Sequence, residues 1–560
     1  MFAPKSSLAL IAGLAFAGSA YSAPDPVAFD WFSYQGNDAI FEAEVPPGHF
    51  QNPILAGFYP DPSSCRVGND FYLVTSTFGF FPGLPIFHSV DLVNWTQIGH
   101  ALDRPSQLDA SGLRASRNIF APTIRHHDGN FYLIVTDVDG INNFYLTATD
   151  PAGPWSEPKL LPWINGIDPS FFFDDDGRVY ITHNGPPPEN KSLYEGHRAV
   201  WLWEIDLETN QPIGEGEIII NGGVDLSEQP VWIEAPHVFK KDGWYYLTCA
   251  EGGTSVNHSQ VIFRAESMDG EWIPWENNPI LTQRDLPADR ENPIVAAGHA
   301  DFLELPNGDW WATFLAIRPY EGGFYNTGRE TYLLPIEWTD DGWPIFLEQG
   351  EEIPWTLPKP DLPASDEASQ PTTGNFAWKD DFLNPTLGYE WVFLRTPKGN
   401  WASVDNEKGE LLIQPQVHSL SELENPSFLS RRQQHSSYDA QTRLSVPDAD
   451  VSAGIGAFIR EDYYFYFGVK TVGDELVAFL EKADGGAAQV VAETVLSGLE
   501  SERWVTLGMS AETSEVDFYV VLPNGERRVI VENEDATVLT TTRAWGFIGA
   551  MFGPYARLEL

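Results

Sequence analysis

Three acidic residues in this chain stand in frames that suit acid–base chemistry. Asp61 and Asp168 are each followed by Pro-Ser, and Glu234 is followed by Ala-Pro-His. All three lie in apolar runs, where burying a carboxylate is costly unless it is paired. The structural alternative for each acid is a turn residue that caps a backbone amide. As a set, the three carboxylates are the kind of group that donates and accepts protons in general acid–base catalysis.

A turn followed by an aromatic strand occurs five times and indicates how these acids are positioned. The copies are Gly68–Leu73, Asp128–Leu133, Asp176–Ile181, Asp242–Leu247 and Asn307–Ala312. Asp-Gly and Asn-Gly suit a tight hairpin turn, and the aromatic residues that follow suit a strand. Their spacing of roughly 50–65 residues is that of one four-stranded blade. The sequence therefore predicts an all-β chain with a five-bladed β-propeller over residues 45–353.

The acids hold equivalent places in this repeat. About eleven or twelve residues before each hairpin aromatic lie Asp61, Phe120–Ala121, Asp168, Glu234 and His299. The first strand of each propeller blade lines the central channel, so these five positions are expected to converge there. Three carboxylates gathered at one end of an axis weaken the turn-cap alternative.

A carboxylate cluster without a phosphate loop, a Ser-His-Asp arrangement or metal-ligand spacing indicates cleavage of a glycosidic bond. That reaction needs one carboxylate that activates water or attacks carbon, and one protonated carboxyl that releases the leaving oxygen. A third acid would raise the pKa of the proton donor. Opposed blades leave room for a water molecule, which favours the inverting geometry, with about 6.5–9.5 Å between the carboxyl groups.

Further motifs follow one another from about residue 50 to residue 350. They are Asn52–Leu55, Phe58–Ser63, Phe81–Gly83, Ile86–Ser89, Ile233–His237, Ala250–Thr254, Gly298–Asp301, Arg318–Pro319 and Gly328–Thr331. In order and spacing this set resembles glycoside hydrolase family 43, in its β-xylosidase and α-L-arabinofuranosidase branch. The resemblance implies an inverting mechanism, with Asp61 as general base, Asp168 as the residue that tunes the pKa, and Glu234 as general acid.

The resemblance also implies roles for residues around the acids. Arg318 would bind the hydroxyl groups of the terminal sugar, and Phe78 would form a wall of the pocket. Phe120 opens Phe-Ala-Pro-Thr where the family has Trp-Ala-Pro-Asp, which changes the pocket wall and leaves the preferred sugar open. His299 would lie on the axis near a water molecule or a calcium ion, although the chemistry requires no cofactor. The alternatives are an ordinary ion pair for Arg318, and plain core positions for Phe78 and His299.

A second domain is expected after a linker over residues 354–376, which is rich in Pro, Ser, Asp and Thr. Residues 377–560 contain short alternating strand patterns typical of a β-sandwich. This part is similar to the lectin-like, concanavalin-type jelly roll that many family members carry. In those relatives a sandwich loop closes one end of the site, and Met551 or Phe552 would be the residue here. A site closed in this way accepts chain ends, which implies exo action.

Composition and charge exclude several partners. The formal net charge of −47, from 80 acidic and 33 basic residues, would repel nucleic acid. Residues 1–22 have the pattern of a signal peptide, with Lys5 before the short apolar run Leu8–Ala17, so we expect a secreted or periplasmic protein with no membrane span. Cys65 and Cys249 fall in blades one and four, which are not neighbours, so two separate buried thiols are predicted.

The sequence leaves the substrate open between two sugars. Release of terminal xylose from xylo-oligosaccharides is the first interpretation, and removal of α-L-arabinofuranose from arabinoxylan or arabinan is the alternative, because the two sugars present similar hydroxyl patterns. A sugar-binding protein without catalysis is a third interpretation. The presence of Asp61, Asp168 and Glu234 together argues against it.

Overall fold

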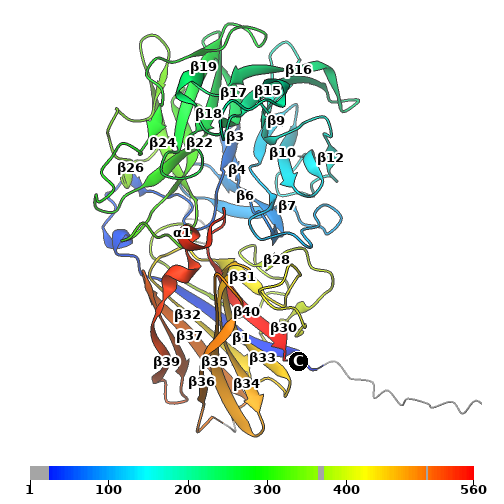
Figure 1. Cartoon of the computed structure of the whole chain (residues 1–560), viewed down its shortest axis with the longest axis vertical. Helices are drawn as coiled ribbons and strands as arrows, with labels where there is room; N and C mark the ends of the chain where they lie inside the picture. The colour runs from blue at the N-terminus through cyan, green and yellow to red at the C-terminus, as the bar shows by residue number, and fades with distance from the viewer. Residues whose placement is uncertain (1–23, 364–370, 500–501, 560) are drawn as a thin grey trace, which may run out of the picture.

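The computed structural model describes residues 24–363, 371–499 and 502–559, and within them strands dominate (Figure 1). One short α-helix occurs in this part of the chain, α1 (Thr541–Ala544), with 3₁₀ turns at Ala39–Glu42, Pro188–Asn190, Leu226–Glu228 and Ala536–Leu539. No helix among these residues is long and apolar enough to cross a membrane. The signal peptide expected over residues 1–22 lies outside the described residues, so export stays a prediction.

Five antiparallel sheets, each one blade, surround a common axis in the upper half of Figure 1. In chain order they are β3 (Ser63–Val67), β4 (Asp70–Val74), β6 (Gly83–Ser89) and β7 (Thr96–Leu102); β8 (Asn118–Ile119), β9 (Thr123–His127), β10 (Asn130–Val138), β11 (Asn142–Ala148) and β12 (Lys159–Leu160); β13 (Ile167–Phe173), β14 (Val179–Gly185), β15 (Ala199–Asp206) and β16 (Gln211–Asn221); β17 (Glu234–Lys241), β18 (Trp244–Glu251), β19 (Ser259–Ala265), β20 (Ile273–Pro274) and β21 (Leu281–Thr282); β22 (Val295–Glu304), β23 (Trp310–Ile317), β24 (Glu330–Trp338) and β25 (Pro344–Ile345). The predicted five-bladed propeller is confirmed.

The repeated turns found in the sequence connect the inner strand of each blade to the next strand. In every copy the turn glycine has a positive φ, between 66° at Gly68 and 90° at Gly308. Residues with a side chain rarely adopt this conformation, which explains why the turn contains glycine each time. Cys65 and Cys249 lie in blades one and four, and both are buried free thiols, as predicted.

The lower half of Figure 1 is a β-sandwich of two eight-stranded sheets. One sheet contains β29 (Ala402–Asp405), β30 (Glu410–Ile413), β1 (Val27–Gly36), β32 (Tyr438–Ser445), β37 (Trp504–Glu512), β38 (Glu515–Val521) and β39 (Arg527–Asp535), with β27 (Ala377–Asp380) beside β1. The other contains β36 (Gln489–Val495), β35 (Glu475–Asp484), β34 (Tyr463–Val472), β33 (Val451–Arg460), β40 (Met551–Leu558), β31 (Leu429–Arg432), β28 (Val392–Leu394) and β5 (Phe80–Phe81). The predicted sandwich after the propeller is therefore confirmed.

Two strands of the sandwich lie outside residues 377–560, where it was predicted. β1 precedes the whole propeller, yet it lies in the middle of one sheet, between β30 and β32. β5 belongs to the chain of blade one and pairs with β28. The stretch expected as a linker also contributes a strand, β26 (Thr356–Pro358), which pairs with β2 (His49–Gln51). The two domains thus share strands as well as a surface.

Phe32 tests the contribution of β1 to the sandwich. Its side chain is fully buried, with ring centroids 5.5 Å from Trp391 and 6.1 Å from Phe552. We expect Phe32→Ala to lower the free energy of unfolding by about 3–5 kcal/mol, because it leaves a cavity in an aromatic core. Urea unfolding followed by tryptophan fluorescence measures the change. Leu383→Ala, at a side chain that is 66% exposed, is the control and should change little; equal midpoints for the two variants would contradict the prediction.

Candidate active site

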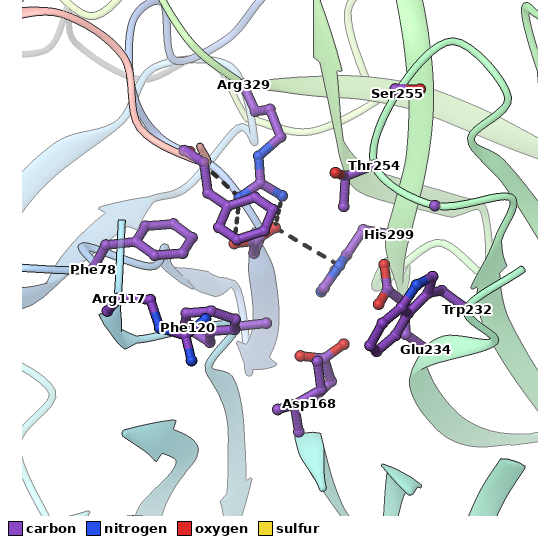
Figure 2. Close-up of a pocket in the computed structure, with 15 residues that line it drawn as sticks. Phe78, Arg117, Phe120, Asp168, Trp232, Glu234, Thr254, Ser255, His299 and Arg329 are labelled. Carbon is purple, nitrogen blue, oxygen red and sulfur yellow. Dashed lines mark hydrogen bonds and ion pairs between the residues drawn. The ribbon is translucent and has the colours of Figure 1, made fainter. Parts of the chain in front are cut away.

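A pocket of about 510 Å³ opens at one end of the propeller axis and contains most of the residues predicted from the sequence (Figure 2). Its lining consists of Asp61, Phe78, Arg117, Phe120, Ala121, Ile167, Asp168, Trp232, Glu234, Gly253, Thr254, Ser255, His299, Arg329 and Phe547. The structure therefore brings together the three acids, His299 and both predicted phenylalanines, and it does not place Arg318 among them.

The site residues lie where the inner strands depart from regular pairing. The register of the inner strand shifts between Ile167 and Ser170 in blade three, and between Glu234 and His237 in blade four. Asp168 adopts a φ of 55°, and Asp61 a φ of 54° just before β3. Irregular pairing of this kind re-aims a side chain, and non-glycine residues at positive φ are typical of functional sites. The strained backbone thus turns these carboxylates towards the pocket.

Asp61 is held by a cation and a hydroxyl group. Arg329 donates from Nη1 to Oδ1 of Asp61 at 2.6 Å and from Nη2 to Oδ2 at 3.3 Å, while the Ser76 hydroxyl donates to Oδ2. The side chains of Asp61 and Arg329 are both almost fully buried. The arginine therefore fixes the orientation of the carboxylate and places a positive charge beside it.

Asp168 and Glu234 line the same pocket as Asp61 and retain protons more readily than ordinary carboxyls. Burial, and next the charge of Asp61, raise the pKa of Asp168 to about 7. Burial, and next the charges of Asp168 and Asp61, raise the pKa of Glu234 well above its usual value. Asp168 also accepts a hydrogen bond from the backbone N–H of Ala235 at 3.1 Å, which links it to the strand that carries Glu234. Near neutral pH the pair thus keeps a protonated carboxyl in the pocket.

Three phenylalanine rings form the apolar wall. The ring centroids of Phe78 and Phe120 are 5.1 Å apart, and Phe547 lies 5.7 Å from Phe78 and 5.6 Å from Phe120. Phe547 comes from the segment of the sandwich between α1 and β40 (Figure 1). The second domain therefore completes the pocket.

The sandwich residue expected at the site, Met551 or Phe552, was wrongly placed. Both side chains are fully buried within β40, where they serve the sandwich core. The loop before β40 reaches the site, and the backbone N–H of Ala550 donates to the Asn326 carbonyl at 2.7 Å. Gly328 in that propeller loop has a φ of 71°, and a Cβ there would come within 2.8 Å of Gly549. This close approach of two backbones positions Phe547.

The expectation that Arg318 binds the sugar hydroxyls does not fit its surroundings. Its Nε donates to Glu330 at 2.8 Å, one Nη donates to the Asp38 carboxylate, and the other donates to the Gln434 carbonyl at 2.6 Å. The side chain is only 6% exposed and joins the propeller to the segment after β1 and to the sandwich. Its donors are used for structure, and Arg329 is the arginine in the pocket.

His299 lies beside one carboxylate of the pocket and is buried. Its Nδ1 lies 3.8 Å from Asp61, whose carboxylate is already paired with Arg329. Burial lowers the pKa of His299 to about 4, so the ring is neutral. Among the described residues no three His, Cys, Asp or Glu side chains gather as a metal-binding set, whereas calcium takes about six to eight oxygen ligands. The calcium ion stays an untested expectation, and no catalytic step is derived through it.

Several lining residues were not singled out from the sequence. Arg329 and Thr254 belong to motifs that carried the family resemblance. The motifs indicated the right segments, but the sequence did not show which residue in each segment lines the pocket. Trp232 lies two positions before Glu234, directly beside a recognised motif. Arg117 and Phe547 had no signal, because loops from different elements bring them to the pocket.

Comparisons with known proteins agree with this architecture. Residues 50–344 match the family model for glycosyl hydrolases family 43, and residues 379–559 match the β-xylosidase C-terminal concanavalin A-like domain. The chain is similar to a crystal structure of a family 43 protein retrieved from a capybara gut metagenome, with 40% identity, a TM-score of 0.89, and coverage of 95% of this chain and 100% of that one. It also resembles a xylan β-1,4-xylosidase from Bacillus halodurans, with 31% identity, a TM-score of 0.81, and coverage of 91% and 97%.

Two curated relatives match over nearly the whole length. A xylosidase/arabinosidase from Butyrivibrio fibrisolvens is 37% identical over 509 residues, which cover 90% of this chain and 95% of the relative. A non-reducing end α-L-arabinofuranosidase from Bacteroides ovatus is 35% identical over 515 residues, which cover 90% of this chain and 91% of the relative. With three buried carboxylates in the channel of a five-bladed propeller, and with both domain models matched in order, the chain belongs to glycosyl hydrolases family 43.

Proposed function

We propose that this enzyme is an exo-acting, inverting glycoside hydrolase that releases terminal xylose from xylo-oligosaccharides. The observation that carries the proposal is the placement of Asp61, Asp168 and Glu234 in one pocket that Phe547 closes on one side. The names of relatives support a pentose, since they include xylosidase/arabinosidase and β-xylosidase. Proton NMR of the first-formed anomer tests the mechanism, and a retained configuration would contradict it.

In this mechanism Glu234 protonates the leaving oxygen while Asp61 removes a proton from the attacking water. The raised pKa of Glu234 supports the acid role, because an acid must carry its proton at working pH. The contacts from Arg329 and Ser76 support the base role of Asp61, because they orient its carboxylate. Asp168 acts through Glu234, since its charge raises the pKa of that carboxyl.

An arabinofuranosidase is the second candidate, supported by the relative from Bacteroides ovatus, whose name specifies that activity. Phe120 stands on the pocket wall where the resemblance expects tryptophan, so this wall contributes to the choice between the sugars. Paired assays with p-nitrophenyl β-xyloside and p-nitrophenyl α-L-arabinofuranoside separate the candidates. Absence of turnover on every glycoside would support a sugar-binding protein instead.

Glu234→Gln tests the proton donor. We expect kcat on xylobiose to fall by about 10²- to 10⁴-fold, because the leaving sugar oxygen needs a proton. The loss on p-nitrophenyl xyloside should be smaller, because nitrophenolate leaves more readily without one. Steady-state kinetics on both substrates measures the difference. Glu304→Gln, at an exposed position of blade five, is the control; a Glu234→Gln enzyme with full activity would overturn the assignment.

Asp168→Asn tests the tuning of Glu234 by a neighbouring charge. A raised pKa means that Glu234 loses its proton, and the enzyme its activity, only as pH rises through that pKa. Removing the Asp168 charge lowers the pKa of Glu234, so the alkaline limb of the kcat/KM profile should move to lower pH. Asp128→Asn, in the exposed hairpin turn of blade two, is the control. An alkaline limb that stays in place or moves to higher pH would contradict the role.

The two arginines should behave differently when replaced by methionine. Arg329→Met releases Asp61, and a misplaced base should lower kcat/KM by about 10²-fold. Arg318→Met leaves Asp38 and Glu330 buried without their cation and should lower the free energy of unfolding by about 3–5 kcal/mol. Kinetics per folded protein and urea unfolding measure the two effects. A large loss of turnover for folded Arg318→Met, with little loss of stability, would contradict this division.

A further inference from the structure

Trp232 stands out on the rim of the pocket. The residue is 39% exposed although it lines a pocket, and its backbone has a φ of 53°. A bulky residue at positive φ is strained and is retained where the surroundings impose it, often at a ligand site. We propose that Trp232 is the stacking platform for the leaving-group sugar, on the reducing side of the scissile bond. This inference rests on the proposed function and adds a binding site to it.

The position of the acid determines on which side the leaving group lies. Glu234 would protonate the oxygen of the departing sugar, so that sugar must extend from the pocket past Glu234. Trp232 and Glu234 are two positions apart in the chain and line the same pocket, and Figure 2 draws them on the same side of it, with Phe78 and Phe120 on the other. The three-phenylalanine wall therefore faces the terminal sugar, and Trp232 faces the next one.

The indole is held in place by residues of blade three. The Arg198 guanidinium lies over the ring at 5.1 Å from its centroid and donates from Nε and Nη2 to Asn184 Oδ1 at 2.9 and 2.7 Å. Asn184 in turn donates to the Ile233 carbonyl at 2.6 Å, and the Trp232 N–H donates to the Gly196 carbonyl at 2.9 Å. Arg198 covers one part of the indole ring. These contacts fix the ring, so its exposed part is already oriented to bind the leaving-group sugar.

The surroundings of Trp232 suit a neutral pyranose. The neighbouring Val231 is 40% exposed, and the Gly252 N–H donates to its carbonyl at 2.8 Å, which joins this segment to the loop that carries Thr254 and Ser255. The loop thus brings two hydroxyl side chains to the same side of the pocket. A flat apolar ring next to hydroxyl groups matches a sugar with an apolar face and polar edges.

The test compares an oligosaccharide that reaches the rim with a monosaccharide that does not. For Trp232→Ala we expect kcat/KM on xylotetraose to fall by about 10- to 100-fold, as for the loss of one buried aromatic contact. The inhibition constant of free xylose, which occupies only the terminal-sugar pocket, should stay unchanged. Trp232→Phe should retain most of the activity, because a ring remains.

The control is Trp244→Ala, which removes another half-buried, arginine-stacked tryptophan at the opposite end of blade four. It should leave both readouts unchanged. Equal losses for xylotetraose and for xylose binding in Trp232→Ala would show that Trp232 only shapes the pocket, and would overturn the platform. Unaltered kcat/KM on xylotetraose would also overturn it, with the proposed function intact. No turnover of xylotetraose by the unmodified enzyme would overturn the proposed function and the platform together.

Discussion

The ion pair between Arg329 and Asp61 is the interaction on which the site depends. Three carboxyl groups lie buried within one pocket, and three buried negative charges would repel one another strongly. Arg329 compensates the charge of Asp61 directly. Asp168 and Glu234 lie farther from the cations, so burial and mutual repulsion keep a proton on the pair. One arginine thereby divides chemically similar groups into a charged carboxylate and a proton-retaining pair, which is the division of labour that acid–base catalysis requires.

Much of this arrangement could be predicted because it follows from the repeat. Asp61, Asp168, Glu234 and His299 occupy equivalent places on the inner strands or, for Asp61, just before one, so counting back from the hairpin turns was sufficient to bring them together. The choice between Arg318 and Arg329 could not be made in this way. It depends on whether Asp38, far away in the chain, captures one guanidinium, and no local pattern records such a contact.

The contribution of the second domain was predictable in kind and not in detail. Alternating strands indicated a sandwich, but the wall residue depends on how the sandwich docks. Phe547 reaches Phe78 because Gly549 packs directly against Gly328. These two glycines belong to different domains and lie far apart in the sequence. The place of β1 had no signal either, because its partners β30 and β32 lie on the far side of the propeller in the sequence.

The position of β1 has a consequence for how the molecule is made. This strand precedes the propeller, yet its neighbour β32 follows the propeller, so that Tyr34 pairs with Ala440. Pairing between such distant segments is slow and comes late. The sandwich can close only after β32 and β40 have been made, and Phe547, just before β40, docks on the propeller at that stage. A chain that stops before Phe547 would therefore carry its three acids in a pocket that lacks one ring of its wall, and the finished shape of the site is coupled to closure of the sandwich.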